Sequence, residues 1–240
     1  MKRNLAITRN RKLCYVGNAK AGNTTIFNLL FYYDRNFLYP YKNIYESKNA
    51  LKREPIAKIN ASNDTLVFSF VRNPFRRILS CFFSKVVSES DEKYFFLRDI
   101  LVCNYSMNPK DEPQVNFKKF LNFLSDRFKE RDYQNINVHW RPQITNLTLG
   151  NPRIDYIGRI ENFLTQITYI LQKVDAPSML FDFIEVQYNV TGSNKMKLSD
   201  FFDEEATNLI LDLYKEDFEV FGYSKELIDN QIFSNDFIYL

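Results

Sequence analysis

Short apolar runs alternate along the chain with longer segments in which apolar residues recur at helical spacing. Residues 12–16 form an apolar run that ends at Gly17, which predicts a buried strand followed by a turn. Apolar side chains then recur every three or four residues over 23–37, which predicts a helix. Strand, glycine-bounded turn and helix together are the beginning of a βαβ unit.

The same alternation continues downstream. Residues 66–71 are β-branched and aromatic and predict a central parallel strand, after which Pro74 is well placed to begin a helix over 75–87. The remaining predicted elements are a mostly helical region over 90–131, with an amphipathic stretch at 117–128, a strand over 154–160, a helix over 162–174 and an amphipathic helix over 203–218. Because strands alternate with helices, we expect a three-layer α/β/α fold with a mostly parallel central sheet.

The bulk composition limits the classes of function. A length of 240 residues without a long linker or repeat predicts one domain over 1–240. A net charge of +3 is too weak to argue for nucleic acid, and we expect none as a partner. Three cysteines without paired spacing predict no disulfide framework and a reducing compartment. No apolar run approaches the roughly 20 residues that span a bilayer, so we expect a cytoplasmic protein without an integral membrane segment.

The loop over 17–25, Gly-Asn-Ala-Lys-Ala-Gly-Asn-Thr-Thr, opens the first predicted helix. Its glycines have the spacing of a nucleotide-triphosphatase phosphate loop, but Asn23 stands at the usual lysine position and Lys20 lies inside the loop. Because a helix N-terminus presents N–H groups and positive potential, we predict an anion site. Its candidate ligands are Ala19, Lys20, Ala21, Gly22, Asn23, Thr24 and Thr25. The alternative is an ordinary glycine turn with Asn23 as the helix N-cap.

A second candidate phosphate site consists of Arg72, which follows the predicted strand over 66–71, and Ser80, about two helical turns later. Arginine binds a phosphate monoester through two N–H groups, and a serine hydroxyl can complete such a site. The alternative is that Arg72 pairs with an acidic neighbour and that Ser80 is only a small helix residue. We expect Arg76 and Arg77 at the surface.

Five ordered segments, covering roughly residues 13 to 223, resemble the carbohydrate sulfotransferase family. The 17–25 loop is similar to the family's 5′-phosphosulfate loop, with Asn18 where proline is common, and residues 72–80 are similar to its 3′-phosphate motif. The other matching segments are His-Trp-Arg-Pro-Gln at 139–143, Tyr-Ile-Gly-Arg-Ile-Glu at 156–161 and Asp-Phe-Glu-Val-Phe-Gly-Tyr at 217–223.

The resemblance implies a P-loop-containing α/β fold and a carbohydrate O-sulfotransferase that uses 3′-phosphoadenosine 5′-phosphosulfate (PAPS) as its donor. Lys20 and the loop would hold the 5′-phosphosulfate, Arg72 and Ser80 the 3′-phosphate, and Arg159 would lie near the adenine or the 3′-phosphate. The acceptor would be a hydroxyl of a glycan or polysaccharide precursor. No metal would be required, because the protein supplies the cations. The family's animal Golgi enzymes carry a membrane anchor that is missing here, which implies a cytoplasmic, bacterial-type version.

The acceptor hydroxyl needs a general base, and His139 is the single histidine of the chain. We therefore predict Lys20 and His139 as catalytic residues, with Trp140 and Gln143 contacting the acceptor. Two alternatives remain open for His139: it orders the loop beside Trp140, or it stacks on a sugar ring. In either case a nearby carboxylate would be the base.

Two rival functions follow from the same residues. A P-loop kinase or nucleotide triphosphatase would need a lysine at position 23 and an acidic residue after the 66–71 strand, where the chain has Asn23 and Arg72. The second rival is a non-catalytic nucleotide-fold binding module, which the sequence leaves open.

Overall fold

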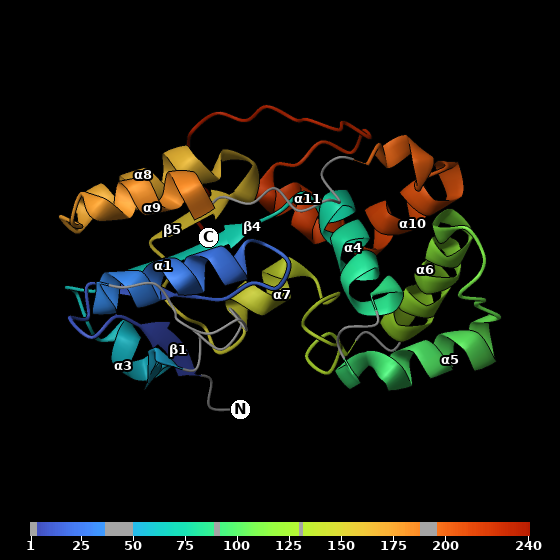
Figure 1. Ribbon diagram of the computed structural model, residues 1–240, viewed down its shortest axis with the longest axis horizontal. Helices are drawn as coiled ribbons and strands as arrows, with labels where there is room; N and C mark the ends of the chain where they lie inside the picture. The colour runs from blue at the N-terminus through green and yellow to red at the C-terminus, as the bar shows by residue number, and fades with distance from the viewer. Residues whose placement is uncertain (1–3, 37–49, 89–91, 130–131, 188–195) are drawn as a thin grey trace. The chain divides into compact units, whose positions relative to one another are not determined.

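The computed structural model of the protein describes residues 4–36, 50–88, 92–129, 132–187 and 196–240 (Figure 1). The chain forms two compact units. Unit 1 comprises residues 1–72, 146–190 and 232–240, and unit 2 comprises 73–145 and 191–231. Each is described by itself below. The prediction of a single domain over 1–240 stays a prediction.

Unit 1 contains a five-stranded sheet. Its strands are β1 (Asn4–Ile7), β2 (Leu13–Tyr15), β3 (Lys52–Pro55), β4 (Leu66–Val71) and β5 (Tyr156–Arg159), in the order β3-β1-β2-β4-β5. β4 pairs in parallel with both β2 and β5, whereas β1 is antiparallel to its neighbours β2 and β3. Four of these described strands therefore run in one direction and β1 runs in the other. This arrangement confirms the predicted α/β fold with a mostly parallel sheet.

One face of this sheet packs against three helices, α1 (Asn23–Arg35), α8 (Phe163–Lys173) and α9 (Met179–Gln187) (Figure 1). Alternate residues of the central strands supply the apolar surface, among them Tyr15, Phe68 and Phe70. Successive residues of a strand point to opposite faces, so Cys14, Val67, Ser69 and Val71 lie on the other face, where all four are buried. A short helix, α3 (Ile56–Asn60), follows β3.

Unit 2 is helical. Its helices are α4 (Pro74–Phe82), continued by a π-helical turn (Phe83–Val87), α5 (Phe95–Tyr105), α6 (Pro113–Lys129), α10 (Glu204–Leu213) and α11 (Lys215–Phe221), with 3₁₀ turns at Glu92–Tyr94 and Leu198–Asp200. Helix α7 (Gln143–Thr148) runs from unit 2 into unit 1. Phenylalanine rings fill the core: Phe75 contacts Phe202 and Phe218, each with ring centroids 5.1 Å apart. The high phenylalanine content therefore serves packing.

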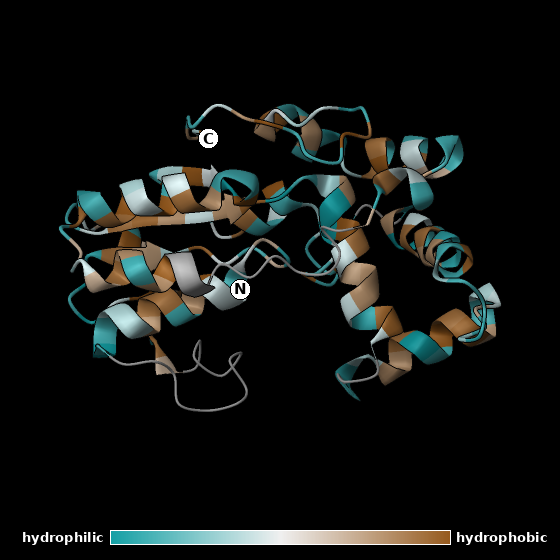
Figure 2. Ribbon diagram, turned by 45° about the horizontal axis from the view of Figure 1, so that its top comes forward, coloured by the Kyte–Doolittle hydropathy of each residue, from teal (hydrophilic) through white to brown (hydrophobic). Residues whose placement is uncertain are grey.

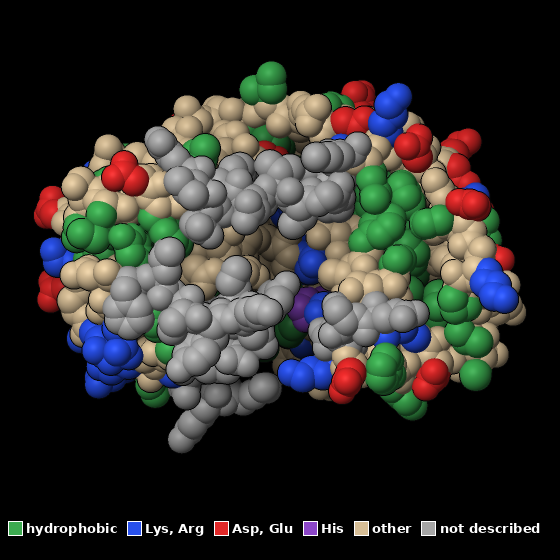
Figure 3. All heavy atoms as spheres, viewed as in Figure 1, with side chains coloured by type: hydrophobic (Ala, Val, Ile, Leu, Met, Phe, Trp, Pro, Cys, Tyr) green, Lys and Arg blue, Asp and Glu red, His purple; other side chains and the backbone are tan. Residues whose placement is uncertain are grey.

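The helices of both units show bands of polar and apolar residues, as expected for helices with one buried face (Figure 2). Among the described helices, none is both long and apolar enough to cross a bilayer. On the face shown in Figure 3, Lys and Arg side chains lie among Asp and Glu side chains, in keeping with the small net charge of +3.

The structure confirms the predicted strands at β2, β4 and β5 and the predicted helices at α1, α6 and α8. The single helix predicted over 203–218 is wrong. It is divided at Tyr214, whose backbone (φ −118°, ψ 23°) leaves the helical region between α10 and α11. Tyr214 is fully buried, and its hydroxyl donates a hydrogen bond to the carbonyl oxygen of Trp140 at 2.6 Å. This tertiary contact accounts for the break.

Candidate functional site

The predicted phosphate loop of unit 1 runs from the end of β2 into α1 and contains two residues with left-handed backbone. Lys20 has φ +68° and Gly22 has φ +77°. A Cβ atom at Gly22 would lie 2.6 Å from Cδ1 of Ile160, the residue after β5. Backbone conformation and crowding therefore both favour glycine at position 22.

Two asparagines anchor the start of this loop. The side-chain oxygen of Asn23 accepts hydrogen bonds from the Tyr15 hydroxyl at 2.6 Å and from the backbone N–H of Asn18 at 3.1 Å. Asn18 is fully buried, and its side-chain NH₂ donates to the carbonyl oxygen of Phe70 at 3.1 Å. The hypothesis that Asn23 caps α1 is wrong, since Gly22 is the N-cap. Asn23, which stands at the position of the lysine in a nucleotide triphosphatase, instead connects the loop to β2.

The first turn of α1 has the character of an anion site. The N-cap is a glycine, and no acidic residue lies in the first turn. The half-buried Thr24 and Thr25 add hydroxyl groups, while the small Ala19 and Ala21 are buried. Backbone N–H groups and the helix dipole at such an end favour a phosphate or sulfate group. The residues present thus fit the 5′-phosphosulfate end of the predicted donor.

Two arginines lie at the carboxyl ends of the strands next to this loop. Arg72 directly follows β4, and its Nη1 lies 3.4 Å from the carbonyl oxygen of Lys20, to which it donates a hydrogen bond. Arg159 ends β5, paired in register with Val71 of β4. Within unit 1 the structure therefore brings Lys20, Arg72 and Arg159 to one end of the sheet, which is where parallel sheets bind their ligands.

The Arg-Asn-Pro sequence that follows β4 begins helix α4. Asn73 is its N-cap, whose side-chain oxygen accepts a hydrogen bond from the backbone N–H of Arg76 at 3.3 Å, and Pro74 occupies the first helical position. Ser80 lies two turns further along α4 in unit 2 and is 5% exposed.

The expectation that Arg76 and Arg77 lie at the surface is wrong. Both are buried, because the polypeptide of unit 2 supplies acceptors for their guanidinium groups. Arg76 pairs with the Asp229 carboxylate at 2.7 Å, and Arg77 donates to the carbonyl oxygen of Val138 at 3.2 Å.

Residues 134–141 of unit 2 form a turn that carries His139. Arg141 is buried and donates from Nε to the carbonyl oxygen of Ile136 at 2.9 Å, so that this arginine and Arg77 hold neighbouring carbonyl groups. The backbone N–H of His139 donates to the Asn137 side chain at 3.0 Å, and the imidazole packs edge-on against the ring of Tyr94. The histidine is thus presented by a turn whose backbone is fixed by buried side chains.

Asp217 fixes the end of the 139–143 segment, a role that sequence reasoning missed. Its fully buried carboxylate accepts the backbone N–H of Gln143 at 2.8 Å and that of Ile144 at 2.9 Å. Three residues earlier, Tyr214 holds the carbonyl oxygen of Trp140. The Asp-Phe-Glu-Val-Phe-Gly-Tyr sequence was visible, but its contact with a segment 74 residues away was not.

The predicted acceptor ligands Trp140 and Gln143 are both buried in unit 2. Trp140 packs edge-on against Phe120 and Phe123, and the Gln143 side chain donates a hydrogen bond to Asp217. These contacts give both residues a structural role, since they hold the 139–143 segment in place. Their contact with an acceptor stays a prediction.

The burial of Asp217 predicts a pH dependence of stability. Burial raises the pKa of its carboxyl to about 6, although Arg77 and the Gln143 and Ile144 N–H groups act in the opposite direction. Since the unfolded carboxyl has a pKa near 3.9, the folded state retains this proton between about pH 4 and pH 6. The contribution of Asp217 to the free energy of unfolding should therefore fall by about 3 kcal/mol as the pH rises through that window.

Denaturant unfolding of the wild type and of Asp217→Asn across pH 4–8 would measure this effect. The difference in stability between the two proteins should change between pH 4 and 6 and be constant above pH 7, because asparagine does not titrate. A difference that is the same at every pH would contradict the assignment.

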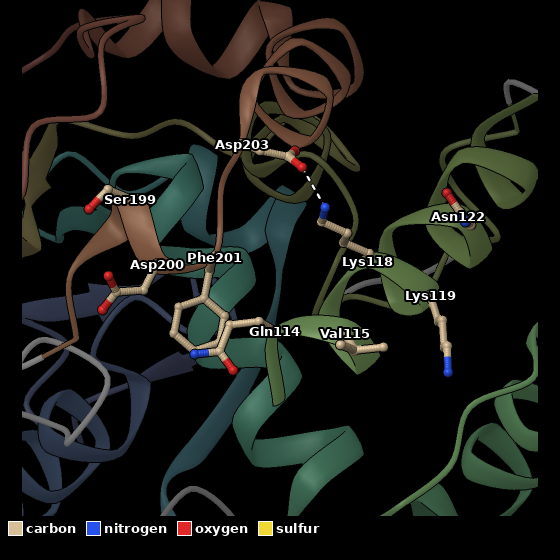
Figure 4. Close-up of a pocket in the computed structure, with 9 residues that line it drawn as sticks. All are labelled: Gln114, Val115, Lys118, Lys119, Asn122, Ser199, Asp200, Phe201 and Asp203. Carbon is tan, nitrogen blue, oxygen red and sulfur yellow. Dashed lines mark hydrogen bonds and ion pairs between the residues drawn. The ribbon is translucent and has the colours of Figure 1, made fainter. Parts of the chain in front are cut away.

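A cavity of about 480 Å³ lies elsewhere in unit 2, between α6 and residues 199–203 (Figure 4). Lys118 and Asp203 pair along its wall at 2.5 Å. None of the predicted site residues lines it, so it has no part in the chemistry derived from the loop and strand ends.

Comparison with known proteins places the chain in a family. The sequence model of the sulfotransferase family matches residues 3–224. Carbohydrate sulfotransferase 10 of Xenopus laevis is 27% identical over 176 residues, which cover 68% of this chain and 48% of that protein. Carbohydrate sulfotransferase 10 of Homo sapiens is 26% identical over 66% of this chain and 47% of its own length.

Carbohydrate sulfotransferase 12 of Xenopus laevis is 26% identical over 66% of this chain and 40% of its own length. The chain thus matches about half or less of the length of these curated relatives. No solved structure matches it significantly. The family match covers nearly the whole chain and includes the phosphate loop, the strand-end arginines and the His139 segment, so the chain belongs to the sulfotransferase family.

Proposed function

We propose that this sulfotransferase moves a sulfuryl group from PAPS to a hydroxyl of a carbohydrate. The observation that carries the proposal is the phosphate loop of unit 1, which has Asn23 in place of the triphosphatase lysine, a lysine within the loop, and Arg72 bonded to the loop backbone. A donor with two separate phosphate positions suits this arrangement better than a triphosphate with magnesium. The printed names of the relatives support a carbohydrate acceptor.

When bound, PAPS would supply the sulfuryl group: the acceptor oxygen forms a new bond to sulfur, and 3′-phosphoadenosine 5′-phosphate leaves as the old sulfur–oxygen bond breaks. The N–H groups at the start of α1, with Thr24 and Thr25, hold the 5′-phosphate. Lys20 stabilises the negative charge that develops on the bridging oxygen, as positioned cations do in group transfer. Arg72 binds the 3′-phosphate and thereby selects this donor over ATP.

His139 accepts the proton of the acceptor hydroxyl as a general base. The turn at 134–141 carries this histidine. Arg77 and Arg141 bind carbonyl groups of the turn, and Asp217 binds N–H groups of the adjoining segment. The cytoplasmic location expected from the sequence is part of the same proposal.

The proposal is tested by incubating the protein with PAPS and a panel of galactosamine-, galactose- and uronate-containing glycans, followed by mass spectrometry of the glycans. The expected result is a sulfated product with at least one of them, formed without added metal. Hydrolysis of ATP with magnesium, with no sulfated product from any glycan, would favour the triphosphatase alternative and contradict the proposal.

A further inference from the structure

Residues 232–240 of unit 1 lie along β5, beyond the part of the chain that the family model matches. Ile238 pairs antiparallel with Ile157, through two backbone hydrogen bonds of 3.0 and 3.3 Å. The Phe237 ring packs edge-on against Tyr156, with ring centroids 4.8 Å apart. The segment is therefore docked on the edge strand of the sheet by backbone and side-chain contacts.

Two polar side chains of the α8 region fix the path of this segment. The side-chain NH₂ of Asn162 donates to the carbonyl oxygen of Ser234 at 2.8 Å. Gln166 is 1% exposed and donates to the carbonyl oxygen of Asp236 at 3.1 Å, while its own oxygen accepts the backbone N–H of Arg159 at 2.7 Å. One buried glutamine thus connects the segment to the end of β5.

The Arg159 side chain contacts the same segment directly. Its guanidinium carbon lies 4.9 Å from the centroid of the Phe233 ring, and its Nη1 donates to the carbonyl oxygen of Asp236 at 3.4 Å. An aromatic ring attracts a guanidinium group placed over its face. The contacts with Phe233 and with the Asp236 carbonyl therefore fix the orientation of the Arg159 guanidinium group.

Arg159 also lies next to the phosphate loop. The residue that follows it, Ile160, is the side chain that a Cβ at Gly22 would strike. In the parallel pair of β4 and β5, Arg159 is in register with Val71, the residue before Arg72. The segment thus contacts the guanidinium group of Arg159, which lies at the carboxyl ends of the parallel strands.

We propose that residues 232–240 are a positioning element of the donor site, in which Phe233 and the Asp236 carbonyl orient Arg159 toward a phosphate group of the nucleotide. This inference rests on the proposed function, because it takes PAPS as the donor. The positioning residue is Phe233, which acts through Arg159.

The test is calorimetric binding of 3′-phosphoadenosine 5′-phosphate (PAP) to the whole chain carrying Phe233→Leu, Arg159→Ala or both. Leucine keeps an apolar side chain at a half-buried position but removes the ring under the guanidinium. We expect Phe233→Leu to weaken PAP binding about two- to fivefold, the size of one cation–π contact, and to have no further effect in the Arg159→Ala protein. Phe96→Leu is the matched control, since Phe96 is 75% exposed on α5 of unit 2 and lies outside the proposed element, and it should bind PAP like the wild type.

Three results would overturn the inference. An equal loss from Phe233→Leu in the presence and absence of Arg159 would show a purely structural segment. Tighter PAP binding by Phe233→Leu would show that the segment competes with the nucleotide for Arg159. If Phe233→Leu and Phe96→Leu both bind PAP like the wild type, the inference fails while the proposed donor stands. A wild type that binds no PAP would overturn the proposed donor itself.

Discussion

Replacing Lys20 with methionine is expected to slow sulfuryl transfer by about 10²–10³-fold. Lys20 is the cation carried by the loop that opens α1, where charge on the bridging oxygen has to be stabilised as the sulfur–oxygen bond breaks. Methionine keeps a long unbranched side chain but removes the charge. The left-handed backbone at position 20 imposes the same conformation on both residues, so folding should change little. Steady-state kinetics with saturating PAPS measures the loss.

The matched control is Lys110→Met, because Lys110 is an exposed lysine of unit 2. It should retain the wild-type rate, which separates the position of the charge from the net charge of the protein. A Lys20→Met protein that is folded and keeps more than a tenth of the wild-type rate would contradict the role of Lys20.

Replacing His139 with alanine is expected to lower the transfer rate by about 10²–10⁴-fold, the usual contribution of a general base. Binding of PAP should be unchanged, since the proposed role concerns the acceptor and not the donor. Rates and PAP affinities of the two proteins provide the measurement.

Val138→Ala serves as the neighbouring control. The Val138 side chain is 46% exposed, and the carbonyl oxygen that accepts from Arg77 is kept in the variant. Its rate should stay near that of the wild type. If His139→Ala loses less than about tenfold, a carboxylate is the base and the histidine has a positioning role.

The fold was predictable where local sequence carries the structural information. The run over 66–71 is buried almost throughout and appears as β4, and the spacing over 23–37 appears as α1. Strand β3 was missed because its sequence, Lys-Arg-Glu-Pro, has no apolar signature. The residue it buries is Glu54, whose carboxylate is held by Arg11 and Lys52. An edge strand stabilised by ion pairs does not follow the hydrophobic pattern on which the prediction relied.

Some parts of the candidate site could likewise be located from the sequence, and others could not. The positions of the loop and of Arg72 could be predicted because each directly follows a strand, while their contacts with a ligand stay predictions. The roles of Asp217 and of residues 232–240 could not, because they depend on contacts with residues 70 or more positions away. Gly158 is an intermediate case: the sequence shows the glycine, but the reason for it is the Phe70 ring, 2.5 Å from where a Cβ would lie.

The central claim is that the loop over 17–25, together with Arg72, is a site for a nucleotide carrying separate 5′ and 3′ phosphate groups. Calorimetry with PAP, adenosine 5′-phosphate and ATP with magnesium tests it most directly. We predict that PAP binds about 10- to 100-fold more tightly than adenosine 5′-phosphate, the contribution of charge-assisted hydrogen bonds to one phosphate, and more tightly than ATP with magnesium. Equal affinity for PAP and adenosine 5′-phosphate, or tighter binding of ATP with magnesium, would contradict the claim.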